Sequence, residues 1–507
     1  MRNVEDKNAI TALIPLIDKA FEQTVDADIT LPDYCPEIVR VLQCSANPNL
    51  VKVQIEGSKI ICDGYVRFVV LYTSENPGRL HSFVNIQNFT KTIETGIALS
   101  DLTEVTVKSE YVQARATGSR SIIAKSAVSV HVFDQTFDST IVTLQSQSSD
   151  IQLKNKSCEV SIPTGRQVKS FLTEIEINPE FDDTECVLDA EANVYLDEYK
   201  VMDGKVMVKG QILLESSLLS SEGDVHKITN RSNFSQFIPF ETAVPSMLCK
   251  FKCNVLECKE EVEQDIDGSV NKLSFLVTAN LYVTCYENRQ VDVALDGYST
   301  LYETETEYQK ATLMQYKPVT NATSHVSKRI VFDVPIKSVI DQKIELYANA
   351  QSVEDDTAGF PCFGKLHLIA EGEDNQIYVW SKAIDFTVDL SELKEYQFFD
   401  PAAVIVDHVN IKTEQNSVLL SFDVRLQGMF VISTEITCLK ELEPNTEQKK
   451  ERDESVAMMI YFANQGESVW DIAKRYNTTA RQISAANALT GETIKQKQVV
   501  LIPLVSG

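Results

Sequence analysis

The chain has 507 residues, 43% hydrophobic and 24% charged, which is ordinary for a soluble globular protein and too long for a single hydrophobic core. Its net charge of −26 argues against nucleic acid as a partner, because phosphate backbones are bound by clustered Lys and Arg. The longest apolar runs, such as 66–72, fall far short of the roughly 20 residues of a transmembrane helix. We therefore expect a soluble protein of about three or four domains without a transmembrane segment.

The N-terminal residues, MRNVEDKNAI, are polar and mixed in charge, unlike a signal peptide, so we expect a protein that stays in the cytosol. Eleven cysteines without a disulfide-framework rhythm agree with reduced thiols in that compartment. The next apolar residues are spaced as one face of an amphipathic helix: Ala9, Ile10, Leu13, Ile14, Ile17 and Phe21. Because basic residues are sparse, we expect this helix to dock on the first β-domain rather than on a membrane.

The body of the chain is rich in Val, Ile, Thr and Tyr in alternating patterns, and one order of elements recurs three times. In the first copy Gly57 and Gly64 precede strand-like segments up to Tyr72, Phe89 follows, and a strand pair lies at 105–116 and 121–132. The second copy has Gly204, Gly210 and Phe234, then 248–258 and 272–285. The third has Gly364, a strand-like segment at 383–388 and a closing strand pair at 403–411 and 417–428. It lacks the second glycine, near Ala370. A period near 150 residues indicates domain duplication rather than a solenoid, whose repeats run to roughly 20–50 residues.

These glycines are expected to serve tight turns or close strand approach, because no helix follows them to present its N-terminus to a phosphate. The predicted fold class is mainly β: three antiparallel β-sandwich or barrel-like repeat domains followed by a small βααβ domain. The predicted boundaries are 1–145 for the N-terminal helix with the first β-domain, 150–310, 315–442, 443–457 for a charged linker, and 458–507 for the C-terminal domain.

The C-terminal segment has the most specific pattern. A short strand from Met459 to Phe462 leads to a turn, and Val469, Ile472, Ala473 and Tyr476 follow with the spacing of one helical face. Thr478 and Thr479 offer an N-cap for a second helix with Ile483, Ala486 and Asn487, and Val500 and Ile502 alternate in a closing strand. Five basic and three acidic side chains give this segment a net charge of +2, which leaves −28 on the preceding residues and would favour an acidic partner.

This segment closely resembles the LysM domain, at positions that include Tyr461, Gly466, Trp470, Ile472, Asn487 and Pro503. The repeat resembles the SPOCS domain of spore-coat proteins, through the entry motif 29–38 (ITLPDYCPEI), Gly57, Gly64, Val70-Leu71-Tyr72 and Phe89. Three such repeats followed by a LysM domain resemble the SipL-type family of clostridial spore coat morphogenetic proteins. The resemblance implies a mother-cell cytoplasmic protein at the forespore surface.

No pattern of catalytic residues stands out. The sequence holds no HExxH, GxSxG, P-loop or GxGxxG motif, and its six histidines are isolated in sequence. Cys249, Cys253 and Cys258 fit strand core packing better than a zinc knuckle, and Cys35 reads as a buried thiol rather than a nucleophile. We therefore expect no enzyme activity, no metal and no cofactor.

The resemblance implies that the LysM domain binds a protein, the coat-basement ATPase called stage IV sporulation protein A, while the β-domains form a scaffold for other coat proteins or for self-association. Trp470 is expected to be half-exposed, as a contact anchor or as a rim residue packed on the second helix. The candidate partner-binding residues are Gln465, Gly466, Glu467, Trp470, Lys474, Arg475, Leu489, Thr490, Ile494 and Lys495. The alternative is recognition of peptidoglycan or a lipid-linked wall precursor, because LysM domains normally bind N-acetylglucosamine polymers between the loops equivalent to 465–470 and 489–494. Lys495-Gln496-Lys497 replaces the usual proline-glycine before the last strand, which weakens that alternative.

Overall fold

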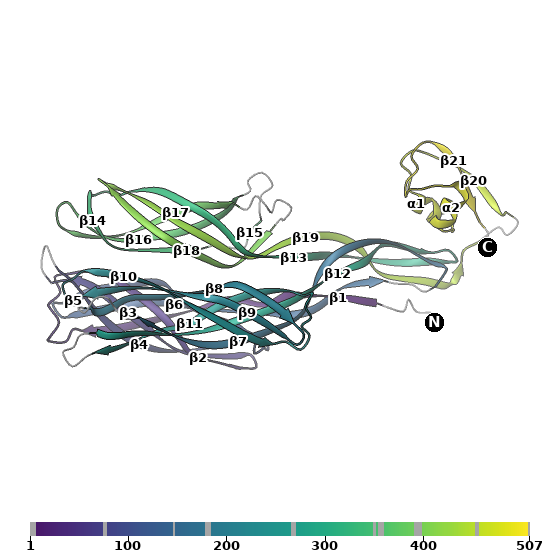
Figure 1. Ribbon diagram of the computed structural model, residues 1–507. Helices are drawn as coiled ribbons and strands as arrows, with labels where there is room; N and C mark the ends of the chain where they lie inside the picture. The colour runs from purple at the N-terminus through teal and green to yellow at the C-terminus, as the bar shows by residue number, and fades with distance from the viewer. Residues whose placement is uncertain are drawn as a thin grey trace.

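The computed structural model describes residues 7–74, 79–144, 148–177, 184–264, 270–347, 351–352, 359–389, 398–451 and 456–504. This part of the chain consists mostly of strands, with two short helices close to the C-terminus. Three β-units form an elongated body, and a small domain with both helices sits at one end of it (Figure 1). The predicted fold class, mainly antiparallel β followed by a βααβ domain, is confirmed.

The first unit holds six strands in two antiparallel sheets, ordered β1-β6-β5 and β2-β3-β4. These strands are β1 (Lys7–Thr30), β2 (Arg40–Glu56), β3 (Lys59–Thr73), β4 (Leu80–Glu94), β5 (Glu104–Gly118) and β6 (Ser121–Leu144). Alternate residues of each strand face inward, so that Val66 and Phe68 of β3 share one core with Val128 and Val130 of β6. The unit is therefore a β-sandwich.

The second and third units repeat this strand order. The second has the sheets β7-β12-β11 and β8-β9-β10, and the third has β13-β19-β18 and β14-β16-β17, with the two-residue β15 paired to β18. The strands of the second unit are β7 (Ile151–Ile177), β8 (Thr184–Met202), β9 (Lys205–Ser220), β10 (Val225–Pro239), β11 (Leu248–Gln264) and β12 (Val270–Ser299). Those of the third are β13 (Tyr302–Val331), β14 (Ile336–Tyr347), β15 (Gln351–Ser352), β16 (Gly359–Gly372), β17 (Ile377–Asp389), β18 (Phe398–Glu414) and β19 (Ser417–Lys449).

The recurring second glycine has a steric cause. A Cβ at Gly64 would lie 2.2 Å from the carbonyl oxygen of Asn49 and 2.9 Å from the Phe89 ring. Gly210 has the same surroundings, with the Tyr195 carbonyl oxygen at 2.2 Å and the Phe234 ring at 2.8 Å. The close backbone approach in the middle of each sheet therefore requires glycine.

The expectation that the third copy lacks this glycine is wrong. Gly364 pairs with Leu346 and Ile384, just as Gly64 pairs with Leu50 and Phe89. Gly364 is therefore equivalent to the second glycine of the repeat and not to the first. Sequence spacing does not reveal this, because the connection from Tyr347 to Gly359 is much longer than the tight turn at Gly57.

The predicted N-terminal helix is also wrong, because residues 9–21 belong to strand β1, which pairs with β6 along its whole length. Pro15 opposes a helix at this position, and it lies next to an irregularity in the register between Pro15 and Ile17. Long-range pairing thus overrides a periodicity that resembled a helix.

The observed units span 7–144, 151–299 and 302–449, so that the third unit is longer than the predicted 315–442. The charged linker expected at 443–457 is wrong in its first part, because β19 continues to Lys449, which pairs with Tyr302. Buried Leu439 and Leu442 hold this end of β19 against Ala294 of β12. Residues 452–455 of the predicted linker lie outside the described residues.

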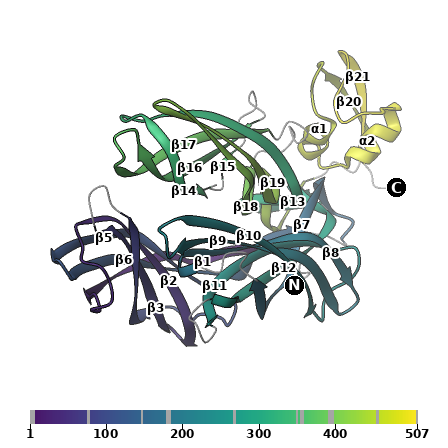
Figure 2. The same cartoon turned by 60° about the vertical axis from the view of Figure 1, so that its left-hand side comes forward.

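The three units pack against one another around a shared apolar cluster. It joins the outer faces of their middle strands through Val69 and Leu71 of β3, Leu219 of β9 and Ile369 of β16. Turning the molecule shows the first and second units side by side, with the third lying over them (Figure 2). Beyond the sandwiches, the long ends of β7, β12, β13 and β19 pack together toward the C-terminal domain.

Candidate functional site

The C-terminal domain comprises β20 (Met458–Ala463), α1 (Val469–Arg475), α2 (Ala480–Asn487) and β21 (Gln498–Pro503). The predicted helical face is buried, with Val469 and Ile472 each 2% exposed and Ala473 fully buried. Thr479 starts α2 with a capping box, in which its hydroxyl accepts from the Gln482 amide and the Gln482 side chain accepts from the Thr479 amide. The predicted βααβ unit and the N-cap at its second helix are thus present.

The two loops proposed to form a ligand groove lie side by side. The Gly466 amide donates to the Ile494 carbonyl oxygen at 2.8 Å, and the Ile494 amide donates to the Glu467 carbonyl oxygen at 2.9 Å. Several predicted site residues are exposed here: Gln465, Gly466, Thr490 and Lys495. Glu467 and Leu489 are half-buried, and Leu489 packs against the domain core. Ile494 is 1% exposed, so its place in the predicted surface is a mistake: it belongs to the core.

Trp470 and Lys474 both contact the β-body. The indole N–H of Trp470 donates to Asp296 Oδ2 at 2.8 Å, and Lys474 Nζ donates to Asp296 Oδ1 at 2.7 Å. Asp296 also accepts from the Tyr308 hydroxyl at 2.9 Å. Burial alone would raise the pKa of Asp296, but these donors outweigh it and hold the pKa below its ordinary value. In this conformation both predicted contact residues anchor the domain to β12.

Tyr298 completes this anchor. Its ring meets Trp470 edge-on, with centroids 5.0 Å apart, and is 1% exposed within the core of the C-terminal domain. Its hydroxyl donates to the Thr478 carbonyl oxygen at 2.7 Å. An aromatic side chain of the second β-unit thus fills part of the core of the C-terminal domain, which fixes how that domain sits on the body.

Arg475, the last predicted basic contact, is exposed beside β20. Its guanidinium lies 3.2 Å from the Tyr461 hydroxyl, which donates to Glu467 at 3.1 Å. Burial pushes the pKa of Glu467 upward, but Asn464, Tyr461 and Arg475 together hold it below its ordinary value. Glu467 is therefore an ionised acceptor that fixes the first loop.

The sequence reasoning missed the outer face of the β20–β21 sheet. Tyr461, Ala463, Val500 and Ile502 point to the core, so their neighbours in both strands point outward. Four of these outward residues are large and apolar, with exposures of 50% for Met458, 61% for Ile460, 68% for Phe462 and 51% for Val499. Ile460 pairs with Leu501, and Phe462 pairs with Val499. We call Met458, Ile460, Phe462 and Val499 the outer apolar face; its sequence signal was the unbroken apolar run MMIYF.

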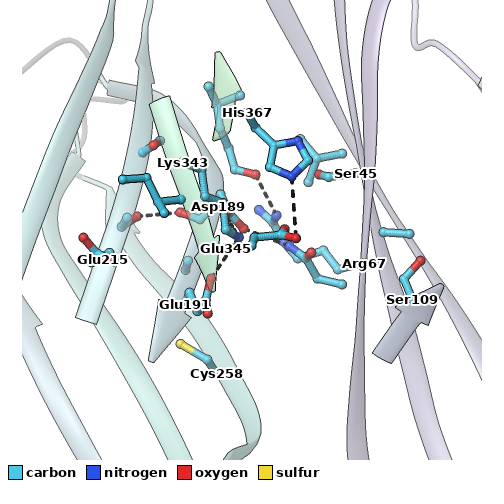
Figure 3. A pocket seen from close by; sticks show the side chains of 18 of the residues that line it. Ser45, Arg67, Ser109, Asp189, Glu191, Glu215, Cys258, Lys343, Glu345 and His367 are labelled. Atoms are coloured by element: carbon cyan, nitrogen blue, oxygen red, sulfur yellow. Dashed lines mark hydrogen bonds and ion pairs between the residues drawn. The ribbon is translucent and has the colours of Figure 1, made fainter. Parts of the chain in front are cut away.

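A second candidate site is a cavity of about 1020 Å³ where the three β-units meet. Figure 3 shows its charged lining, to which Arg67 comes from β3, Asp189 and Glu191 from β8, and Lys343 from β14. Lys343 Nζ lies 2.6 Å from Asp189 and 2.9 Å from Glu191. The Arg67 guanidinium contacts Glu260 at 2.6 Å and donates to the Val187 carbonyl oxygen at 2.6 Å.

These charges pair across unit boundaries. Burial would raise the pKa of Asp189, but Lys343, Asn47 and Arg67 together lower it below its ordinary value. Desolvation would lower the pKa of Lys343, yet Asp189 and Glu191 raise it. Both partners therefore stay charged, which suits a structural junction and not a general acid or base, whose pKa should lie near neutrality.

Two acids in the cavity have the opposite shift. Burial raises the pKa of Glu215 and of Asp341 above their ordinary values, more than the nearby Lys227 lowers them. Glu215 stands five residues after Gly210, the position held by Val69 after Gly64 and by Ile369 after Gly364. The second unit thus places a carboxylate where the other two units have an apolar side chain.

The histidines expected to be isolated are not all so. His325 of β13 and His408 of β18 both hydrogen-bond to Asp423 of β19, at 2.7 and 3.0 Å, on an exposed surface. Within the described ranges no group of three or more His, Cys, Asp or Glu side chains has the arrangement of a metal site. Among the same residues no helix is long and apolar enough to cross a membrane.

Comparison with protein family models places these observations in known domains. The SipL SPOCS domain matches residues 37–117 and 183–263, and the LysM domain matches 464–503. The two SPOCS matches cover the same four strands, β2–β5 and β8–β11, in the first two units. No curated protein and no solved structure matches the chain.

The chain therefore contains two SPOCS domains, in its first and second units, and a C-terminal LysM domain, while the third unit repeats their strand order. The predicted SipL-type organisation is confirmed by two SPOCS matches and the LysM match, which support a sporulation-related, LysM-containing adaptor. Both domain families are non-catalytic.

Proposed function

We propose that this protein is a non-enzymatic adaptor of spore coat assembly. Its LysM domain binds the coat-basement ATPase, stage IV sporulation protein A, and its β-body carries other coat proteins around the forespore, on the side of the mother-cell cytoplasm. The SPOCS and LysM domains support the general role. The choice of a protein as the LysM ligand rests on the surface of that domain.

The outer apolar face is the observation that carries this choice. Ile460 and Phe462 are more than half exposed although they lie in a paired strand, and Val499 and Met458 extend the same surface. Contiguous exposed apolar patches are typical of protein interaction sites, and a few such residues can supply most of the affinity of an interface. β20 and β21 pair only with each other among the described strands, so both strands of this sheet have an open edge.

Charge favours an acidic partner. Lys495 and Lys497 are exposed directly before β21, and Arg475 is exposed beside β20. The LysM segment carries +2 while the rest of the chain carries −28, so the LysM end attracts acidic surfaces and the body repels them. Arg475 and Lys495 therefore keep their proposed contact role, next to an apolar centre.

Recognition of a wall glycan or its lipid-linked precursor is the second candidate. The exposed loop residues Gln465, Gly466 and Thr490 favour it, because they border the groove in which LysM domains hold N-acetylglucosamine. Against it, the indole N–H of Trp470 is already bound to Asp296. Trp470 is thus engaged by Asp296 and Tyr298 of the body.

The two candidates can be separated with the full-length chain. Ile460→Asp places a charge in the outer apolar face, and Val51→Asp is the matched control, because Val51 of β2 is 63% exposed in the body. We expect Ile460→Asp to weaken binding of the purified ATPase by about tenfold or more, and Val51→Asp to leave it unchanged.

The same proteins are tested against peptidoglycan. Unchanged ATPase binding by Ile460→Asp, together with a peptidoglycan interaction that Thr490→Ala abolishes, would select the glycan function. In sporulating cells, a fluorescent fusion of the wild type should surround the forespore, and the Ile460→Asp fusion should stay dispersed in the mother cell.

A further inference from the structure

Two buried cysteines of the second β-unit lie directly opposite each other. Cys249 of β11 pairs in register with Cys285 of β12, and their Sγ atoms are 2.7 Å apart. Their exposed fractions are 1% and 0%, in the core between the two sheets of the unit. Both are free thiols.

We propose that Cys249 and Cys285 form a latent cross-strand disulfide, which closes when a peroxide-class oxidant replaces a reducing environment. Opposed residues of antiparallel strands have Cα atoms about 4.5–5.5 Å apart, inside the roughly 4.4–6.8 Å range of disulfides. The bond therefore forms without moving the strands. Cys253, on the same strand, faces Leu281 and has no such opposed thiol.

The chemistry needs two electrons and two protons. One thiolate attacks the peroxide, which yields a sulfenic acid and releases the other oxygen as water or hydroxide. The second thiol then displaces the sulfenic oxygen as water, so that two thiols and one hydrogen peroxide give one disulfide and two waters. In a reducing cytosol the pair remains a dithiol.

The position of the pair makes the reaction conditional. The hydrogen bond between the two thiols, together with burial, raises the pKa of Cys249. The closed native structure therefore keeps little reactive thiolate and protects the pair from oxidation. β11 is an edge strand of its sheet, and its local opening gives the oxidant access. Oxidation is therefore slow, and it is fastest under conditions that loosen β11.

The bond would strengthen the junction of the units. β11 carries Glu260, which binds Arg67 of the first unit, and Lys250, which forms an ion pair with Asp400 of the third. Joining residues 249 and 285 fixes this strand to the centre of its own sheet. This inference concerns the β-body and does not depend on which partner the LysM domain binds.

The test treats the full-length wild type with hydrogen peroxide, alkylates the remaining thiols and maps the peptides by mass spectrometry. We expect a Cys249–Cys285 crosslink that dithiothreitol reverses and that forms faster in a low concentration of urea. The oxidised protein should unfold about 5 °C or more higher than the reduced protein, because the disulfide restricts the unfolded chain.

Cys285→Ala should show neither the crosslink nor the thermal shift, while Cys253→Ala should behave as the wild type. Absence of the crosslink in wild-type protein, with and without urea, would overturn the proposal even if Cys285→Ala failed to fold. A thermal shift of equal size in Cys285→Ala would also contradict it, because the stabilisation would then come from another site.

Discussion

Trp470 of the LysM domain and Asp296 of the second β-unit are joined by a 2.8 Å hydrogen bond between the indole N–H and the carboxylate. The two residues are 174 positions apart in sequence. Lys474 binds the same carboxylate, and Tyr298 packs against the indole ring. A tryptophan that the sequence predicts as a half-exposed contact anchor or rim residue thus positions its domain on the body.

Replacing Asp296 by Ala should loosen the LysM domain on the body without unfolding it, while Tyr298 still holds it there through the LysM core. The change removes the acceptor of both Trp470 and Lys474, while Val469, Ile472 and Ile483 still fill the LysM core. Small-angle scattering should show a larger radius of gyration. Asp292→Ala, at an exposed position of the same strand, is the control and should leave the scattering curve unchanged. Identical curves for both variants would show that Asp296 does not hold the domain.

Tyr298 allows packing and hydrogen bonding to be measured separately. Tyr298→Phe removes the hydroxyl that binds the Thr478 carbonyl oxygen and should cost about 1–2 kcal/mol of LysM stability. Tyr298→Ala also leaves a cavity between LysM and body and should cost about 3–5 kcal/mol. Denaturant unfolding followed by tryptophan fluorescence measures both, and equal losses for the two variants would mean that the ring contributes nothing by packing.

The sequence predicts the local structure of this protein better than its long-range contacts. The LysM helices follow from apolar spacing around Ile472 and from the Thr479 cap, because both signals lie within a few residues. The repeat follows from Gly64 and Gly210, whose close backbone contacts leave a periodic mark in the chain. Residues 9–21 mislead, because only pairing with distant β6 makes them a strand.

In the candidate site, too, the sequence predicts the local features better than the long-range contacts. Gln465, Thr490 and Lys495 are exposed where the LysM pattern predicts, since loop positions follow from the local sequence. The roles of Trp470 and Lys474 depend on Asp296, and no local pattern reports a partner so far away in the chain. The junction of Asp189 with Lys343 is hidden for the same reason.

Gly64→Ala and Gly210→Ala should each destabilise the body strongly. A Cβ at either position would overlap a backbone carbonyl at 2.2 Å and an aromatic ring, so the sheet must shift. We expect a loss of about 3 kcal/mol or more, at the upper end for single substitutions. Gly118→Ala is the control, because its nearest neighbour would be 3.9 Å away. Thermal unfolding of the three variants is sufficient to compare them.

Removing Lys343 should weaken the junction of the units. Lys343→Ala leaves Asp189 and Glu191 without their cation, and because these side chains are partly exposed we expect a loss of about 1–3 kcal/mol, between surface and buried pairs. Urea unfolding measures it. The exposed pair of Lys209 and Glu198 provides the control, since Lys209→Ala should cost less than about 1 kcal/mol.

Glu215 should make the body less stable at neutral pH than in mild acid. Its folded-state pKa is raised by burial, so its contribution to stability is fully present below its unfolded pKa and is lost as the pH rises through the folded pKa. Asp189 has a lowered pKa, and the nearby His367 ring, whose Nε2 lies 3.5 Å from the Glu345 carboxylate, lowers the pKa of Glu345 to about 2. The contributions of these two acids to stability are therefore lost only as the pH falls through their lowered folded-state pKa values. Glu215→Gln should therefore raise the unfolding temperature at pH 7 and have little effect near pH 4, while Glu241→Gln at an exposed position should change neither. An equal effect of Glu215→Gln at both pH values would exclude its titration as the cause.

Ile460 and Trp470 should differ in their roles: Ile460 contacts the partner, whereas Trp470 positions the LysM domain on the body. Ile460 lies in the outer apolar face, so Ile460→Asp should reduce ATPase binding with or without the Asp296→Ala change. Trp470 contacts the body, so Trp470→Ala should resemble Asp296→Ala in scattering, and the two changes together should add little to either one. A loss of about 2 kcal/mol or more in ATPase binding when Trp470→Ala is added to Asp296→Ala would instead make Trp470 a direct contact of the partner. Titration calorimetry on the wild type, Trp470→Ala, Asp296→Ala and the double variant decides between a positioning role and a contact role for this tryptophan.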